Sequence, residues 1–193
     1  MKFIAPRVEE SRARELADKA TRRWILRAER AFTFFPSRKA PPAGLPRMEL
    51  IWMPSHVYEL ALLFPTGPAP LTFSVDGQTG AFALFQMHDW VEDGTPAGAV
   101  FPPLLDVEQA ERAGRRELVS LLLRQRGRQQ RAQPQPTQSS YVVHFPVWIY
   151  YYARKGDLLD IIAIDGVTGE RASSRRRAGI LQAFQDAASP QGA

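Results

Sequence analysis

The chain of 193 residues is 45% hydrophobic and 23% charged, a balance that is ordinary for a globular protein and unlike that of a disordered one. It contains no cysteine, which excludes disulfide bonds, thiolate metal sites and cysteine nucleophiles. The N-terminal sequence MKFIAPRVEE lacks the long apolar run of a secretory signal, and the longest apolar stretch, about seven residues from Val147 to Ala153, is too short to span a membrane. We therefore expect a cytoplasmic protein with no membrane partner.

The net charge of +5 comes mainly from residues 101–193, which carry 13 basic and 9 acidic side chains. The surplus lies in two arginine-rich clusters, from Arg112 to Arg131 and from Arg171 to Arg177. Two interpretations stay open. Such clusters can meet the phosphates of a nucleic acid, or they are the solvated faces of a chain that uses arginine for most of its basic residues.

Three helices are predicted along the chain. Between Val8 and Trp24, apolar residues largely follow the three-and-four spacing of one helical face. Asp106, with Gln109 three residues later, forms the capping-box pattern that begins a second helix. The segment from Ala178 to Ala188 reads as a short amphipathic helix at the C-terminal end.

Antiparallel strands are predicted in two segments, Met48 to Gly80 and Ser140 to Gly169. Each strand segment follows one of the first two helices. The proline-rich stretch from Pro36 to Pro46 and the polar stretch from Arg131 to Ser140 connect these elements, and residues 88–103 join the two halves of the chain.

The two strand segments read as copies of one another, the pattern of an internal repeat. Four pairs of residues align in order and in spacing: Pro54 with Pro146, Tyr58 with Tyr150, Asp76 with Asp165, and Gly80 with Gly169. We therefore predict an α+β protein of two repeated units, each a helix packed on a three- to four-stranded antiparallel sheet, plus a short C-terminal helix. The predicted boundaries are 1–90 for the first unit, 91–105 for a linker, 106–175 for the second unit, and 176–193 for the C-terminal helix and tail.

Each strand segment ends in nearly the same six residues, VDGQTG from Val75 and IDGVTG from Ile164. The aspartate side chain can accept backbone N–H groups ahead of it, and glycine supplies positive φ angles where a side chain would clash. A phosphate-binding loop is the alternative, but no Lys-Ser/Thr pair and no helical pattern follows directly. The residues assigned to these structural turns are Asp76, Gly77, Thr79, Gly80, Asp165, Gly166, Thr168 and Gly169.

The order of a helix, antiparallel strands and an Asp-x-x-Thr-Gly turn resembles the PepSY domain and its intracellular relatives. In some of those relatives a Pro-x-aromatic strand precedes the turn. The sequence Pro146-Val147-Trp148 fits that pattern, whereas Pro54-Ser55-His56 has a histidine in place of the aromatic residue. The resemblance extends over both units and implies tandem PepSY-like domains, in a family that is mostly secreted or membrane-tethered and often found beside peptidases.

The two copies differ in the faces of their strands, since alternate residues of a strand point to opposite sides. Thr72 and Ser74 of the first copy match Ile161 and Ala163 of the second, so the second sheet is apolar on both faces. We expect the C-terminal helix, a partner subunit or the sheet of the other unit to cover its outer face. The residues assigned to an interaction surface are Trp148, Tyr150, Tyr151, Tyr152, Ile161, Arg175, Arg176 and Arg177.

The sequence contains no recognisable catalytic or metal-binding motif. His56, His88 and His144 lie far apart and in no HxH or HExxH pattern. The serines lie in polar loops without a nucleophile elbow. Paired carboxylates stay open as an acid–base site, because acidic residues distant in sequence can meet in space. We nevertheless predict no enzyme, no metal and no cofactor.

The preferred prediction is a non-catalytic binding module that recognises a protein or a peptide. An exposed strand edge could add a partner strand through backbone hydrogen bonds, or the apolar outer face of the second sheet could pair with its own copy in a homodimer. The second prediction is nucleic-acid binding through the arginine-rich second half, with Arg175 to Arg177 as first candidates. An enzyme without a recognisable motif comes third.

Overall fold

The computed structural model describes residues 1–31, 44–124, 132–154 and 158–188, with side chains described in all but 22–31, 154 and 158. The predicted α+β class and antiparallel sheet are confirmed: three helices accompany a mostly antiparallel sheet of nine strands within these ranges. The elements are β1 (Lys2–Ile4), α1 (Glu10–Ala31), β2 (Arg47–Phe64), β3 (Gly67–Asp76), β4 (Phe82–Leu84), the 3₁₀ helix η1 (His88–Trp90), β5 (Val91–Asp93), β6 (Ala99–Val100), α2 (Val107–Arg124), β7 (Gln133–Pro134), β8 (Ser139–Arg154), β9 (Leu158–Asp165) and α3 (Ser174–Ala188).

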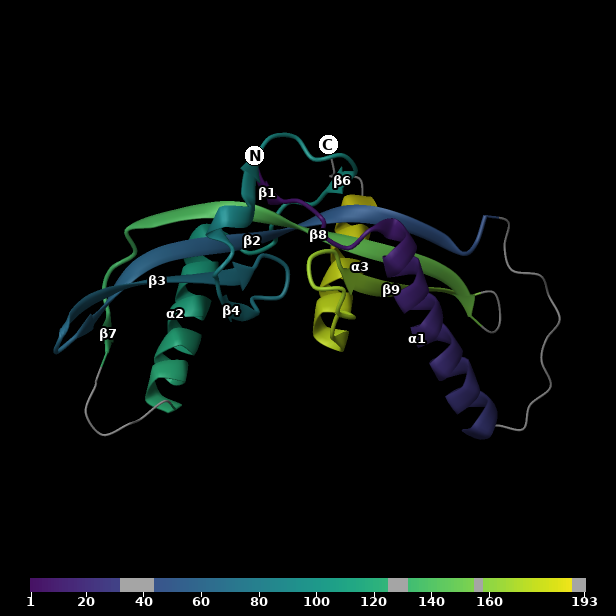
Figure 1. The fold of residues 1–193 in the computed structure, drawn as a ribbon. Coiled ribbons are helices and arrows are strands. Elements are labelled where there is room, and N and C mark those ends of the chain that lie inside the picture. Colours follow the sequence, from purple (N-terminus) through teal and green to yellow (C-terminus); the bar gives the residue numbers. More distant parts are fainter. Residues whose placement is uncertain (32–43, 125–131, 155–157, 189–193) are drawn as a thin grey trace.

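Two long strands form the centre of the molecule (Figure 1). β2 and β8 run antiparallel, from the pair of Arg47 and Tyr151 to the pair of Glu59 and Ser139. β2 then turns back into β3, and β8 turns back into β9, so that a hairpin lies at each end of this ladder. We call β2–β3 the first hairpin and β8–β9 the second hairpin. One sheet is therefore continuous through both hairpins. The sequence did not determine whether the two strand segments share a sheet.

The helices α1 and α2 each cover the hairpin of the other half of the chain. Ala110 and Leu118 of α2 pack on Tyr58 and Phe73 of the first hairpin. Ala13 and Ala17 of α1, in turn, pack on Tyr150, Ile162 and Ile164 of the second hairpin. The prediction that each helix packs on the strands that follow it is therefore wrong. An apolar stripe on a helix requires burial, but it does not specify which apolar sheet buries it.

The short strands before these helices are exchanged in the same way. β1 pairs in parallel with β8, where Lys2 lies opposite Val143, and β6 pairs in parallel with β2, where Ala99 lies opposite Ile51. The segment expected to be a linker, residues 91–105, thus contributes both β5 and β6 to the sheet.

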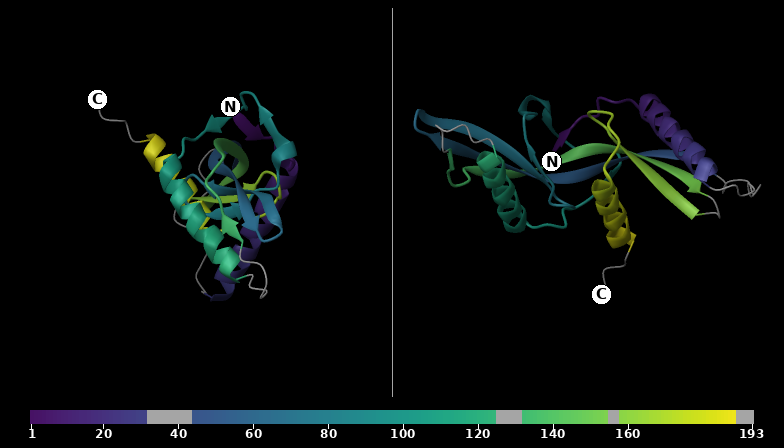
Figure 2. Two further views of the ribbon diagram at one scale, coloured as in Figure 1. Left: turned by 90° about the vertical axis from the view of Figure 1, so that its left-hand side faces the viewer. Right: turned by 90° about the horizontal axis from the view of Figure 1, so that it is seen from below.

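The outer face of the second hairpin is covered by the C-terminal helix α3, one of the three covers that the sequence left open. Ile180 and Ala183 of α3 are buried against Ile149 and Ile161. Seen from below, α1 and α3 lie on opposite sides of the second hairpin (Figure 2). The corresponding face of the first hairpin is covered by the segment after β4, which buries Phe85.

Candidate binding groove

The turns that end the two hairpins have matching hydrogen bonds. In the first turn, residues 76–80, Asp76 Oδ1 accepts the backbone N–H groups of residues 78 and 79 at 3.0 and 2.8 Å. In the second turn, residues 165–169, Asp165 Oδ1 accepts those of residues 167 and 168 at 2.9 and 3.0 Å. Gly80 and Gly169 have φ angles of 67° and 75°, a region that favours glycine.

Each turn also fixes the segment that leads into the covering helix. Gly77 N donates to Pro54 O at 2.9 Å, and its carbonyl oxygen accepts the N–H groups of Leu104 and Leu105, both at 3.0 Å. A Cβ at this position would lie 3.0 Å from Pro54 O. The close approach of the backbone to Pro54 is thus the reason for glycine here.

Gly166 makes the corresponding contacts in the second turn. Its N–H donates to Pro146 O at 2.9 Å, and its carbonyl oxygen accepts the N–H groups of Arg7 and Val8 at 2.8 and 2.9 Å. These hydrogen bonds hold the start of each covering helix over its hairpin. The two turns therefore position helices, and their backbone N–H groups are already used within the chain.

The turns differ in the arginines that approach them from α3. Arg176 pairs with Asp165 at 2.7 Å, and Arg177 pairs with Asp160. Burial raises the pKa of Asp165, but the Arg176 guanidinium and the N–H groups of the turn outweigh it, so this pKa lies below its usual value. Arg175 instead donates to Thr79 O of the first turn at 2.6 Å and is exposed. Of the three arginines predicted to form a surface, only Arg175 has no carboxylate partner among the described residues.

The aromatic residues predicted to form an interaction surface lie largely inside the protein. Trp148 Nε1 donates to Val8 O at 2.7 Å, beneath the start of α1. Tyr150, only 5% exposed, donates to Asp18 of α1 at 2.5 Å, and burial raises its pKa to about 12. Tyr152 donates to Asp160 at 3.0 Å.

Tyr151 and Ile161 lie on the opposite face, against α3. The Tyr151 ring stacks on Phe184 at 6.4 Å between centroids, and Ile161 is 4% exposed. Ile161 is therefore not exposed to a partner, and Tyr151 is partly covered, because α3 packs on this face of the second hairpin. Sequence reasoning found that both faces are apolar and left open what covers them.

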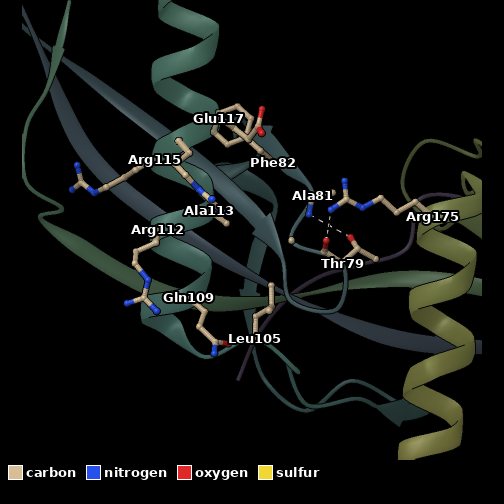
Figure 3. A pocket seen from close by; sticks show the side chains of 12 residues that line it. Thr79, Ala81, Phe82, Leu105, Gln109, Arg112, Ala113, Arg115, Glu117 and Arg175 are labelled. Carbon is tan, nitrogen blue, oxygen red and sulfur yellow. Dashed lines mark hydrogen bonds between the residues drawn. The ribbon is translucent and has the colours of Figure 1, made fainter.

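An open hollow lies beside the first hairpin, between α2, the start of β4 and the first turn of α3 (Figure 3). It measures about 1160 Å³. Its floor includes Phe82 and Leu105, and its rim carries Arg112 and Arg116 from α2 and Arg175 from α3. We call this hollow the arginine groove.

The basic groups of the arginine groove are largely free to meet a ligand. Arg112 and Arg116 are exposed, and Arg112 has only a weak, exposed ion pair with Glu108 at 3.6 Å. Arg116 has no ion-pair partner among the described residues. Arg115 differs, because Glu111 and Thr137 hold it at 2.8 Å each.

The arginine groove thus brings together side chains from both basic clusters of the sequence. The first cluster reaches Arg131, and its residues 125–131 lie outside the described part of the chain. The sequence missed this site because Arg112 and Arg175 meet only through the fold. The available signal was the four-residue spacing of Arg112 and Arg116, which places both on one face of a helix.

The histidines have structural surroundings. His56 is 2% exposed and its Nε2 lies 2.9 Å from Leu105 O, while burial lowers the pKa of His144. Across the described ranges, no group of three or more His, Asp or Glu side chains is arranged to hold a metal ion. None of the described helices is both long and apolar enough to cross a membrane.

Together, the fold and the groove define an α+β protein with an open hollow, lined by arginines, between α2 and α3 beside a continuous sheet. Comparisons with protein-family models, curated proteins and solved structures find no match to this chain.

Proposed function

We propose that this protein is a non-catalytic binding module that takes an acidic segment of a protein or peptide into the arginine groove. The observation that carries the proposal is that three arginines from two helices, Arg112, Arg116 and Arg175, line one hollow. Clustered like charges raise the local concentration of an oppositely charged ligand and its rate of association. The apolar floor at Phe82 and Leu105 adds a surface that a ligand can desolvate.

The groove is favoured over the homodimer route considered from the sequence. That route needs an apolar outer face on the second hairpin, and α3 buries this face with Ile180 and Ala183. A second chain would have to displace a helix of this one to reach it.

Nucleic-acid binding is the alternative occupant of the same groove, supported by the arginine-rich sequence. It receives less support than an acidic peptide, because Arg176 and Arg177 are paired with Asp165 and Asp160. A base-stacking surface would also need exposed aromatic rings, and those of the second hairpin are covered.

The fold supports a further proposal, that the chain is a fused pair of related, PepSY-like halves. The support is the matched placement of corresponding elements. β1 and β6 both pair in parallel with the long strand of the other half, and the helices that follow them cover the other half's hairpin. The two turns then fix these helices through equivalent carbonyl groups, Gly77 O and Gly166 O.

The binding proposal is tested with a fluorescent peptide of alternating threonine and glutamate, Thr-Glu repeated four times. We expect fluorescence anisotropy to show binding that weakens with salt and that falls about tenfold in the double variant Arg112→Gln/Arg116→Gln, roughly the effect of losing two exposed charge contacts.

The matched control is Arg12→Gln/Arg14→Gln, which removes the same charge from exposed positions on α1. An equal loss in this control, or no binding of the peptide by the wild type, contradicts the proposal. Tighter, groove-dependent binding of an oligothymidylate of similar charge would favour the nucleic-acid alternative instead.

A further inference from the structure

The edge strand β4 borders the arginine groove and carries unused backbone groups. Phe85 N donates to Thr72 O at 2.9 Å, and Asp76 N donates to Ala81 O at 2.8 Å. Antiparallel pairing alternates between residues that point their N–H and C=O groups inward and residues that point them outward. Both bonds go to β3, one just before β4 and one just after it. By this alternation the backbone N–H and C=O groups of Phe82 and Leu84 point away from β3. Among the described residues, nothing bonds to them.

The neighbouring edge of β3 cannot receive a strand. The alternation that turns Thr72 toward β4 also turns Pro70 and Pro68 outward, beyond the end of β4. Proline has no N–H to donate, and it is a common protection of exposed edges. The structure thus leaves β4 open and closes the rest of this edge.

The edge of β9, at the far end of the molecule, is already occupied. Asp160 Oδ1 accepts Ile161 N at 2.8 Å, and Arg177 Nε donates to Ile161 O at 3.2 Å. Ala172 N donates to Ala163 O at 2.8 Å. The side chain and backbone of the α3 segment thus take the place that a partner strand would need.

The groove fixes the chemistry of a strand that pairs with β4. Phe82 points to the face of the sheet that α2 covers. Alternate side chains of an added strand would project on that same face, beside Arg112 and Arg116. Farther along the same helical stripe, Val119 and Leu123 are 44% and 53% exposed. This stripe of α2 therefore carries two arginines, Arg112 and Arg116, followed by two exposed apolar residues toward the end of the helix.

We infer that the ligand of the arginine groove is an extended peptide that adds a strand to β4, with acidic side chains at alternate positions and apolar residues at one end. This inference rests on the proposed function and specifies how its ligand binds. Backbone hydrogen bonds from Phe82 and Leu84 supply the pairing, and charge complementarity with Arg112 and Arg116 selects the sequence.

The test substitutes the outward-facing donor of β4. Leu84→Pro removes an N–H that makes no bond to any residue the structure describes, at an edge position where proline is tolerated. We expect it to weaken binding of the threonine–glutamate peptide about tenfold, because the pairing loses a hydrogen bond and meets the proline ring. The matched control Leu84→Ala removes the 43% exposed side chain but keeps the N–H, and it should change the affinity by less than about threefold.

A second measurement uses the wild-type protein and two peptides, N-methylated either at every threonine or at every glutamate. A strand exposes alternate N–H groups on its two edges, so only one of these peptides should lose binding. Equal binding of both methylated peptides, or wild-type affinity in Leu84→Pro, overturns the inference while leaving arginine-dependent binding intact. Absence of binding by the unmodified peptide instead contradicts the proposed function itself, and the inference with it.

Discussion

The two hairpins end in turns with the same hydrogen bonds, yet the chain leaves them in different ways. After the first turn it forms the short strand β4, and after the second turn it enters the helix α3. The helix buries the outer face of the second hairpin and occupies its edge. β4 instead leaves an open edge and a basic hollow beside it. The segment that follows the turn therefore decides whether a hairpin is covered, as the second hairpin is by α3, or can accept a ligand, as the first hairpin can beside β4.

The contrast extends to the aspartates of the turns. Asp165 pairs with Arg176, whereas Asp76 accepts the hydroxyl of Thr79 at 2.9 Å in addition to its two N–H groups. The arginine that approaches the first turn, Arg175, bonds to a carbonyl oxygen and remains exposed. At the second turn, the charge of Arg176 stabilises the turn itself. At the first turn, the charge of Arg175 is not paired with a carboxylate of the described residues and is available to a ligand.

The largest change in stability should come from weakening the contact between α3 and the second hairpin. Ile180 of α3 is 1% exposed within the cluster that α3 forms with the second hairpin. We expect Ile180→Ala to lower the free energy of unfolding by about 2–5 kcal/mol, because it removes buried apolar contact and leaves a cavity. Urea unfolding measures this value. Gln182→Ala, at an exposed position two residues on, is the control and should stay within about 0.5 kcal/mol of the wild type.

The next largest change in stability should come from substitutions where α2 and α1 pack on their hairpins. Gly114 of α2 lies so close to the first hairpin that a Cβ would be 2.3 Å from Phe73 Cε2 and 2.7 Å from Val75 Cγ2. We expect Gly114→Ala to destabilise the protein by about 1–3 kcal/mol through overpacking, although alanine favours helices. Ala17 of α1 is fully buried on the second hairpin, and Ala17→Gly should cost about 1–2 kcal/mol, because it lowers helix propensity and removes a buried methyl group. Stabilisation by Gly114→Ala in thermal melts would contradict the close contact of α2 with Phe73 and Val75.

A smaller, pH-dependent effect should come from the second turn. Since the pKa of Asp165 is lowered in the folded state, its contribution to stability is present above the unfolded pKa of about 3.9 and is lost as the pH falls through the folded pKa. We expect the free energy of unfolding to decline less between pH 6 and pH 3 (roughly the range in which carboxylates titrate) in Asp165→Asn than in the wild type. Parallel pH profiles for the wild type and Asp165→Asn would contradict the role assigned to Arg176.

The smallest effect on stability should come from the arginine groove. Arg116 is exposed and has no ion-pair partner among the described residues. We expect Arg116→Gln to change the free energy of unfolding by less than about 0.5 kcal/mol, measured by urea unfolding. A loss of 2 kcal/mol (the order expected for a buried interaction) would assign Arg116 to the fold and remove it from the ligand site.

Local patterns predicted the long strands, the turns and the short C-terminal helix, because strand alternation, glycine and helical spacing act over a few residues. They did not predict the exchange of α1 and α2, since an apolar stripe on a helix fits either hairpin equally well. Tyr150 and Ile161 were assigned to a surface for the same reason: the sequence shows that a face is apolar, but the packing of distant segments decides whether it is covered. The arginine groove was missed because Arg112 and Arg175 meet only after α3 docks.

The exchange of β1 and α1 for β6 and α2 has a mechanical consequence. The N-terminal half of the chain supplies α1, which covers the second hairpin, and the C-terminal half supplies α2, which covers the first hairpin. Each half therefore packs on the other. Proteolytic cleavage of the connection between Gly94 and Gly98 would therefore leave two fragments that stay associated without a covalent bond. For the same reason, neither half can melt while the other stays intact.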